Sequence, residues 1–158
     1  MAARIVATLR GRGQHITTAE SCTGGLVAGA LTGVAGASEV FERGFVTYSN
    51  AAKIDLLAVE ASLITAHGAV SAEVAAAMAE GARRAASADV ALAVTGIAGP
   101  GGGSAEKPVG LVFMAVAGRG RAPAVEEHRF GDIGREAVRA ASVAAGLALV
   151  LRTLELPS

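Results

Sequence analysis

The chain has 158 residues, no formal net charge, 52% apolar residues and only 3% aromatic residues. This length suits one domain, expected over residues 1–158, whose core is built from small and aliphatic side chains. The balanced charge argues against nucleic-acid binding. The single Cys excludes an internal disulfide or a Cys-based metal cluster. No signal peptide or bilayer-spanning apolar run is found, so a cytoplasmic protein without a membrane partner is expected.

Apolar periodicity predicts helices and strands in alternation. In chain order these are a helix over 3–10, a strand over 14–19, a helix over 23–32, a strand at 45–48, helices over 51–57 and near 63–66, a helix over 72–86, strands over 89–95, 111–117 and 124–130, and a helix over 135–154. Such alternation is typical of a layered α/β domain. The last three strands have no helices between them, which predicts a mixed sheet.

Residues 17–25 (TTAESCTGG) lie at a predicted strand-to-helix corner. Unpaired N–H groups at a helix start, together with the helix dipole, favour an anion or a developing oxyanion. Gly24 lets a ligand approach the backbone closely, and Ser21, Cys22 and Thr23 supply candidate nucleophiles or donors. A plain helix cap is the alternative, because Ser and Thr are common there.

Asn50 is predicted to cap the helix over 51–57, which places Lys53 in its first turn. The positive end of the helix dipole lowers a lysine pKa, and burial lowers it further. A lysine that is partly neutral suits a general base. The alternative is a solvated surface lysine.

Residues 95–110 (TGIAGPGGGSAEKPVG) contain too many glycines to pack as a regular element. The segment matches neither a Walker A loop nor a dinucleotide fingerprint, yet its N–H groups can hold a phosphate or a carboxylate. Arg135 and Arg139 lie one helical turn apart and are candidates for the same phosphate. A flexible connector and a solvated helix face are the alternatives.

Together, residues 17–25, 41–53 (FERGFVTYSNAAK), 67–71 (HGAVS) and 95–110 resemble the CinA carboxy-terminal domain family over nearly the whole chain. The resemblance implies an α/β/α sandwich that is usually oligomeric and needs no metal or cofactor. It also implies a nicotinamide-nucleotide amidohydrolase, which converts nicotinamide mononucleotide and water to nicotinate mononucleotide and ammonia. The longer members carry an amino-terminal pyrophosphatase-like domain, which is not expected here, and Gly101 stands where an Asp is common.

The same resemblance assigns the nucleophile to Ser21 and matches Tyr48 and Lys53 to the Tyr and Lys of the family's T-Y-S-N-x-x-K pattern. We expect Lys53 to be the base, since the three histidines fall outside the cores of the longest motifs, and Tyr48 to relay a proton or orient Lys53.

Oxyanion donors are expected among the N–H groups of Cys22, Thr23, Thr95 and Gly96. The phosphate is expected to contact either the Gly-rich loop or Arg139. The Cys22 thiol is expected to be a small core group rather than the nucleophile. The rival hypothesis is a module that binds a nucleotide without hydrolysing it, in a competence or DNA-damage context.

Overall fold

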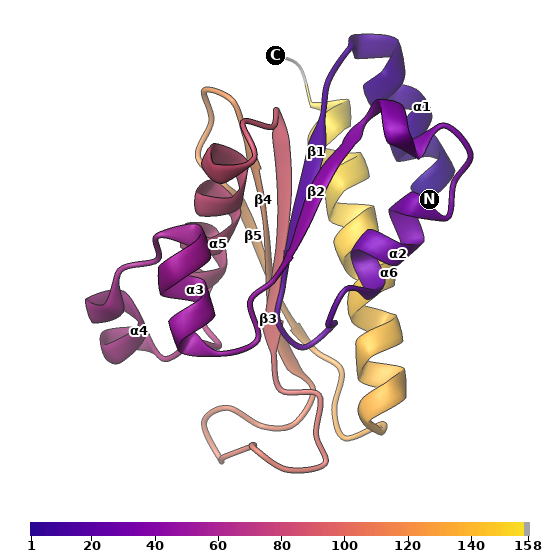
Figure 1. The fold of residues 1–158 in the computed structure, drawn as a ribbon. Coiled ribbons are helices and arrows are strands. Elements are labelled where there is room, and N and C mark those ends of the chain that lie inside the picture. The colour runs from indigo at the N-terminus through magenta and orange to yellow at the C-terminus, as the bar shows by residue number, and fades with distance from the viewer. Residues whose placement is uncertain (157–158) are drawn as a thin grey trace.

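The computed structural model describes residues 1–156 and has a central sheet between two layers of helices (Figure 1). The elements are α1 (Ala2–Arg12), β1 (Ile16–Glu20), α2 (Leu26–Thr32), the 3-10 helix η1 (Ala37–Glu39), β2 (Phe41–Val46), α3 (Asn50–Leu57), α4 (Ala61–His67), α5 (Ala72–Ala85), β3 (Val90–Gly96), β4 (Leu111–Gly118), β5 (Ala124–Arg129) and α6 (Arg135–Glu155). The predicted α/β class is confirmed.

The sheet has the strand order β2-β1-β3-β4-β5. β1 runs parallel to both β2 and β3, whereas β4 and β5 are each antiparallel to the strand before them, so the sheet is mixed as predicted. The three parallel strands therefore end at the same edge, which is where ligands bind in open α/β sheets. In register, Glu20 at the end of β1 lies beside Val46 of β2 and Val94 of β3.

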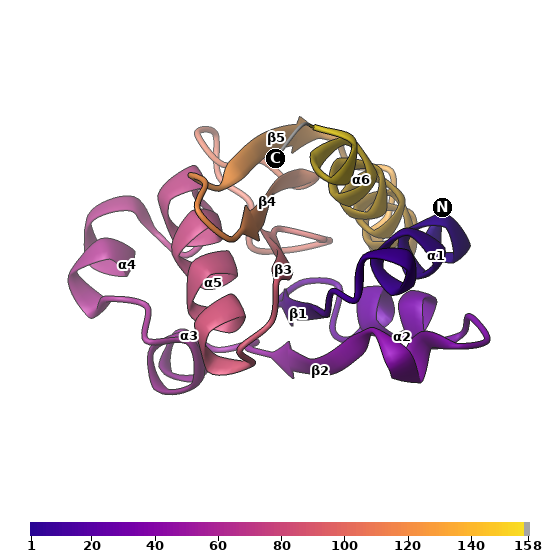
Figure 2. The same ribbon diagram turned by 90° about the horizontal axis from the view of Figure 1, so that it is seen from above.

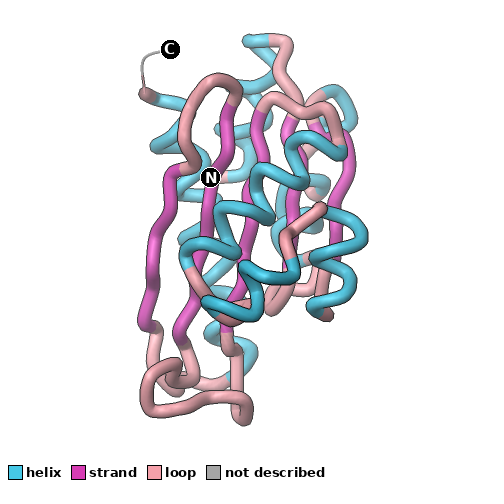
Figure 3. The backbone as a smooth tube through the Cα atoms, turned by 90° about the vertical axis from the view of Figure 1, so that its left-hand side faces the viewer, coloured by secondary structure: helices cyan, strands magenta, loops and turns pink. Residues whose placement is uncertain are grey.

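Helices α1, α2 and α6 cover one face of the sheet, and α3, α4 and α5 lie on the other (Figures 2 and 3). Each layer has its own core. The core under α6 includes Leu9, Leu92 and Val150, and the core under α5 includes Ala93, Met78 and Leu57. Because the sheet separates the two cores, a group at the end of β1 can be reached from either layer.

Helix α6 has a mean hydropathy of 1.5, and within residues 1–156 it is the one helix long and apolar enough to cross a membrane. Its Val138 and Val150 are fully buried, and Leu147 is nearly so, in the core beneath it. Packing against the sheet therefore accounts for this composition.

Three predicted boundaries are wrong around the TTAESCTGG and TYSN segments. Helix α2 begins at Leu26 rather than residue 23, because Gly24 and Gly25 adopt positive φ angles of 58° and 99° in a turn before it. Strand β2 ends at Val46, so Tyr48 lies beyond it. The cap of α3 is Ser49, not Asn50, because the Ser49 side chain accepts the Ala52 N–H.

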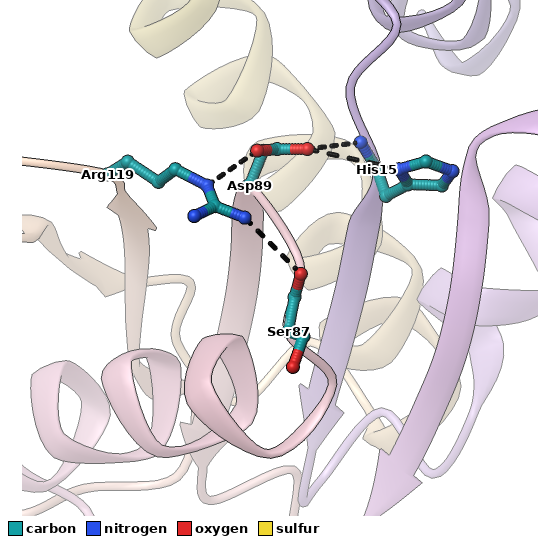
Figure 4. Close-up of polar contacts among 4 residues, drawn as sticks. All are labelled: His15, Ser87, Asp89 and Arg119. Carbon is teal, nitrogen blue, oxygen red and sulfur yellow. Dashed lines mark hydrogen bonds and ion pairs between the residues drawn. The ribbon is translucent and has the colours of Figure 1, made fainter.

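A polar cluster joins three segments at the opposite edge of the sheet, where β1 and β3 begin (Figure 4). The Asp89 carboxylate accepts the His15 backbone N–H at 2.8 Å and the Arg119 Nε–H at 2.6 Å. Arg119 follows β4 directly, so one carboxylate links the starts of β1 and β3 to the β4–β5 turn. Burial alone would raise the pKa of Asp89, but these hydrogen bonds and the charge of Arg119 outweigh it and hold the pKa below its ordinary value of 3.8.

Candidate active site

A cleft of about 290 Å³ lies at the edge where β1 and β3 end. It is lined by all four motif segments, and the Gly-rich connection from β3 to β4 extends beyond this edge (Figure 1). The lining residues are Ser21, Cys22, Tyr48, Asn50, Lys53, Ala69, Val70, Thr95, Gly96, Ile97, Ala98, Gly99, Gly101, Gly102 and Arg135.

Ser21 is the first residue after β1, and its backbone is held on both sides. Its N–H donates to the Val94 carbonyl of β3 at 2.9 Å, while the preceding carbonyl, that of Glu20, accepts the Thr47 N–H at 2.9 Å. The Ser21 residue is 9% exposed and borders the cleft. Its hydroxyl is therefore fixed in position yet open to a small ligand.

Lys53 enters the cleft from α3 with 1% of its surface exposed. Its Nζ is 3.1 Å from Ser21 Oγ, 2.8 Å from the Thr47 carbonyl oxygen and 3.4 Å from that of Tyr48. No carboxylate pairs with this amine among residues 1–156. Burial therefore lowers the pKa of Lys53 below its ordinary value of 10.5, and the alternative of a solvated surface lysine is wrong.

Cys22 is buried beside Ser21 and has a different electrostatic environment. Burial raises the pKa of its thiol to about 11, so the thiol is protonated at neutral pH. Since the thiolate is the reactive form, this favours the expectation that Cys22 is a core group rather than the nucleophile.

Glu20 has a structural role at the start of α2. Its two carboxylate oxygens accept the Val27 and Ala28 N–H groups, each at 2.9 Å, and the residue is 1% exposed. Glu20 thus caps α2 from the face opposite Lys53. The expectation that these helix N–H groups face a ligand is wrong, because a carboxylate of the chain already binds two of them.

The N–H groups of Cys22 and Thr23 remain as candidate oxyanion donors. The next N–H, that of Gly24, donates to the Ser21 carbonyl at 3.1 Å and closes a tight turn. Within the described part of the chain, no oxygen accepts the Cys22 or Thr23 N–H.

The pairing of β3 with β4 directs the N–H groups of Thr95 and Gly96, the two other expected oxyanion donors, to opposite sides of β3. The Ile97 N–H donates to the Leu111 carbonyl, and because hydrogen-bonded pairs alternate along an antiparallel ladder, Thr95 also bonds to β4 while the Gly96 N–H points toward β1. The expectation for the Thr95 N–H is therefore wrong. Thr95 lines the cleft instead through its side chain, whose hydroxyl donates to the Ala69 carbonyl at 2.9 Å.

The structure corrects the expected role of Tyr48. Its side chain is exposed, and its phenolic oxygen accepts a hydrogen bond from Arg135 Nη2 at 3.0 Å. Only the backbone carbonyl of Tyr48 contacts Lys53. Tyr48 lies beyond the end of β2, and its phenol contacts Arg135 at the start of α6. Within residues 1–156, no hydrogen bond joins this phenol to Lys53 or Ser21, so the expected proton relay is not formed.

The two arginines of α6 have different positions. Arg139 does not line the cleft; its Nε and Nη2 donate to the carbonyls of Cys22 and Thr23 at 3.1 and 3.2 Å. Arg135 does line it, and its Nη1 donates to the Gly99 carbonyl at 2.9 Å. The expected phosphate contact at Arg139 is wrong in this arrangement, and Arg135 is the arginine at the rim.

Sequence reasoning missed Asn50, Ala69 and Val70 as lining residues, although the HGAVS segment pointed to the last two. Among the described residues, no group of three or more His, Cys, Asp or Glu side chains is arranged to hold a metal ion.

The CinA C-terminal domain model matches residues 1–154. A CinA-like protein of Syntrophobacter fumaroxidans is 53% identical over 146 residues, which cover 92% of this chain and 34% of the relative, so the chain spans about a third of that protein. The nicotinamide-nucleotide amidohydrolase PncC of Enterobacter agglomerans is 52% identical over 153 residues, covering 96% of this chain and 92% of the relative.

The crystal structure of the competence/damage inducible protein CihA from Agrobacterium tumefaciens superposes with a TM-score of 0.95 at 52% identity, covering 98% of this chain and 93% of that one. A CinA-superfamily protein from Klebsiella pneumoniae superposes with a TM-score of 0.91 at 38% identity, covering 97% and 94%. With its sequence match and its fold in agreement, the chain belongs to the CinA C-terminal domain family.

Proposed function

We propose that the protein is a nicotinamide-nucleotide amidohydrolase with Ser21 as nucleophile and Lys53 as base. The observation that carries this proposal is the 3.1 Å separation of Ser21 Oγ and Lys53 Nζ at a cleft whose lining, among the described residues, includes no carboxylate. Direct hydrogen-bond reach is the first requirement for a nucleophile and its base. The relative named for this activity, which the chain matches over 92% of its length, supports the choice of substrate.

The contacts of Lys53 suit the neutral amine. A neutral amine has two N–H groups, which match the carbonyl oxygens of Thr47 and Tyr48. The lone pair is then left for the Ser21 hydroxyl, which donates to it. Burial favours this neutral form.

In the acylation step, Ser21 Oγ attacks the carboxamide carbon and its proton passes to Lys53. The carbonyl oxygen becomes an oxyanion, for which the N–H groups of Cys22, Thr23 and Gly96 are the candidate donors. The C–N bond then breaks, Lys53 returns the proton to the leaving nitrogen, and ammonia departs. The nicotinoyl group remains on Ser21 as an ester.

In the deacylation step, water attacks the ester and gives its proton to Lys53. The tetrahedral intermediate collapses, the C–O bond to Ser21 breaks, and Lys53 returns the proton to Ser21 Oγ. Nicotinate mononucleotide is released, and its carboxylic acid gives up the second proton of the water to solvent to become the carboxylate. One base thus serves both steps, and no second titratable group is needed.

The proposed binding mode follows from the size of the cleft. A volume of about 290 Å³ is at the lower end for small-molecule sites, which run from about 300 to 1,000 Å³. We place the pyridine ring inside and the ribose phosphate at the rim, where Arg135 and the glycines of the 95–110 loop supply N–H donors. A homo-oligomer in the cytoplasm remains a prediction.

The test is ammonia release from nicotinamide mononucleotide by Ser21→Ala and Lys53→Met. We expect each variant to lose about a thousandfold or more in kcat, because nucleophile and base act as a unit. Ser62→Ala, at an exposed position of α4, is the matched control and should keep wild-type activity. Calorimetric binding of the nucleotide by a wild-type protein that releases no ammonia would replace this proposal with the non-catalytic binding module.

A further inference from the structure

The turn that carries Ser21 is held from both layers of the molecule. Lys53 of α3 reaches Ser21, and Arg139 of α6 reaches the next two carbonyls. Helices α3 and α6 lie on opposite faces of the sheet (Figure 2). Arg139 therefore contacts the backbone of the nucleophile turn without lining the cleft.

The two Arg139 hydrogen bonds determine how the peptide groups of the turn are oriented. Each peptide unit is planar and trans, so its C=O and the following N–H point in opposite directions. With the Cys22 carbonyl bound by Arg139 Nε, the Thr23 N–H points away from Arg139. With the Thr23 carbonyl bound by Nη2, the Gly24 N–H is directed to the Ser21 carbonyl, with which it bonds.

The turn is shaped to receive this guanidinium. Gly24 has a φ of 58°, and a Cβ there would lie 3.4 Å from Arg139 Nη2. A side chain at position 24 would be strained in this conformation and would crowd the contact. Arg139 supplies two donors in a fixed planar fork, which a lysine cannot reproduce.

We propose that Arg139 is a positioning residue that fixes the orientation of the Cys22–Thr23 peptide, and so of the Thr23 N–H, beside the nucleophile. This deepens the proposed function and rests on it. Arg139 acts through the turn alone, whereas Arg135 at the rim contacts the substrate. A rotated Cys22–Thr23 peptide would turn a carbonyl oxygen toward the developing oxyanion. Loss of the two Arg139 hydrogen bonds should therefore affect the chemical step more than substrate binding.

The experiment compares Arg139→Lys and Arg139→Ala with Arg135→Lys, and uses Arg152→Lys as a matched control on the same helix, where the arginine contacts Glu126 instead. Ammonia release from nicotinamide mononucleotide gives kcat and KM. We expect Arg139→Lys to lose about tenfold or more in kcat with KM nearly unchanged, and Arg135→Lys mainly to raise KM. Added guanidinium ion should restore part of the kcat of Arg139→Ala but not of Ser21→Ala, and Arg152→Lys should match the wild type.

A second readout does not require the substrate to be correct. The rate at which a serine-directed fluorophosphonate labels Ser21 should fall in Arg139→Lys, because the same turn stabilises the attack on phosphorus. If Arg139→Ala does not fold, Arg139→Lys alone decides. Unchanged kcat and labelling, or a rise in KM alone, would overturn the positioning role while leaving the proposed function intact. A wild type that labels well but releases no ammonia would remove the proposed substrate, and the labelling rates would still decide the role of Arg139.

Discussion

The buried amine of Lys53 determines how the proposed reaction responds to pH. The base must be neutral, and burial lowers its pKa below 10.5. Activity should therefore rise as pH increases through the Lys53 pKa and level off above it. We expect a plot of log kcat/KM against pH to show an ascending limb whose apparent pKa lies below 10.5, measured by ammonia release.

A matched change at Cys22 checks the assignment of that limb. The Cys22 pKa is raised to about 11, so the thiol titrates above the ascending limb. The Cys22 charge raises the Lys53 pKa, so Cys22→Ser, which removes that charge, should leave the limb in place or move it slightly to lower pH. A limb that moves to higher pH or disappears in Cys22→Ser, or a wild-type profile that is flat across the range, would contradict a lysine base.

At this scale the sequence predicted positions better than roles. The resemblance of the motifs around Ser21 and Lys53 to the family predicted that the two residues meet, and their atoms lie 3.1 Å apart. The side-chain direction of Tyr48 and the N–H direction of Thr95 depend on where β2 ends and on the β3–β4 register. A difference of one residue reverses these directions, and sequence patterns do not determine register to that accuracy.

Among the elements, α3 and α5 determine where Lys53 lies. A Cβ at Gly81 of α5 would overlap the Leu57 carbonyl oxygen at the end of α3. Gly81→Ala should therefore push the two helices apart and destabilise the protein by about 1 to 3 kcal/mol or more. The free energy of unfolding in urea measures this, and kcat should fall as Lys53 moves from Ser21.

Gly29 of α2 is the matched control, because a Cβ there would meet nothing within 4 Å. Gly29→Ala should stabilise the helix by about 0.5 to 1 kcal/mol through its higher helix propensity. Equal stability of the two variants would show that the α3–α5 contact is not tight.

The type of each element, helix or strand, was predictable because the spacing of apolar residues over a long segment remains recognisable despite local irregularities. The first residue of α2 was not predictable, because the residue that caps this helix, Glu20, lies in β1, six residues before the helix begins. Periodicity carries no information about such a cap. For the same reason, the different contacts of Arg135 and Arg139 could not be predicted. One helical turn places both on the same side of α6, but the positions of the β1–α2 turn and the Gly-rich loop determine what each arginine contacts.

For the molecule as a whole, the two ends of the sheet have different tasks. The proposed chemistry lies where the parallel strands end, in agreement with the general rule for open α/β sheets. The Asp89 cluster lies where β1 and β3 begin and joins three segments that are distant in sequence (Figure 4). A change there should affect stability without affecting the reaction.

Asp89→Asn tests this separation. The folded-state pKa of Asp89 is depressed, so its carboxylate contributes stability above its ordinary pKa of 3.8, and that contribution is lost as pH falls through the lower folded-state value. At pH 7 the variant should be less stable by about 1.5 to 3 kcal/mol, the usual range for a hydrogen bond to a charged group. The difference should shrink as the pH falls below 3.8 and through the lower folded-state pKa, where the folded wild-type carboxylate also becomes neutral. Urea unfolding at both pH values measures it, with Asp132→Asn at an exposed loop position as control.

At pH 7 the kcat of Asp89→Asn should equal that of the wild type, and a loss of kcat without a loss of stability would mean that the two ends of the sheet are coupled.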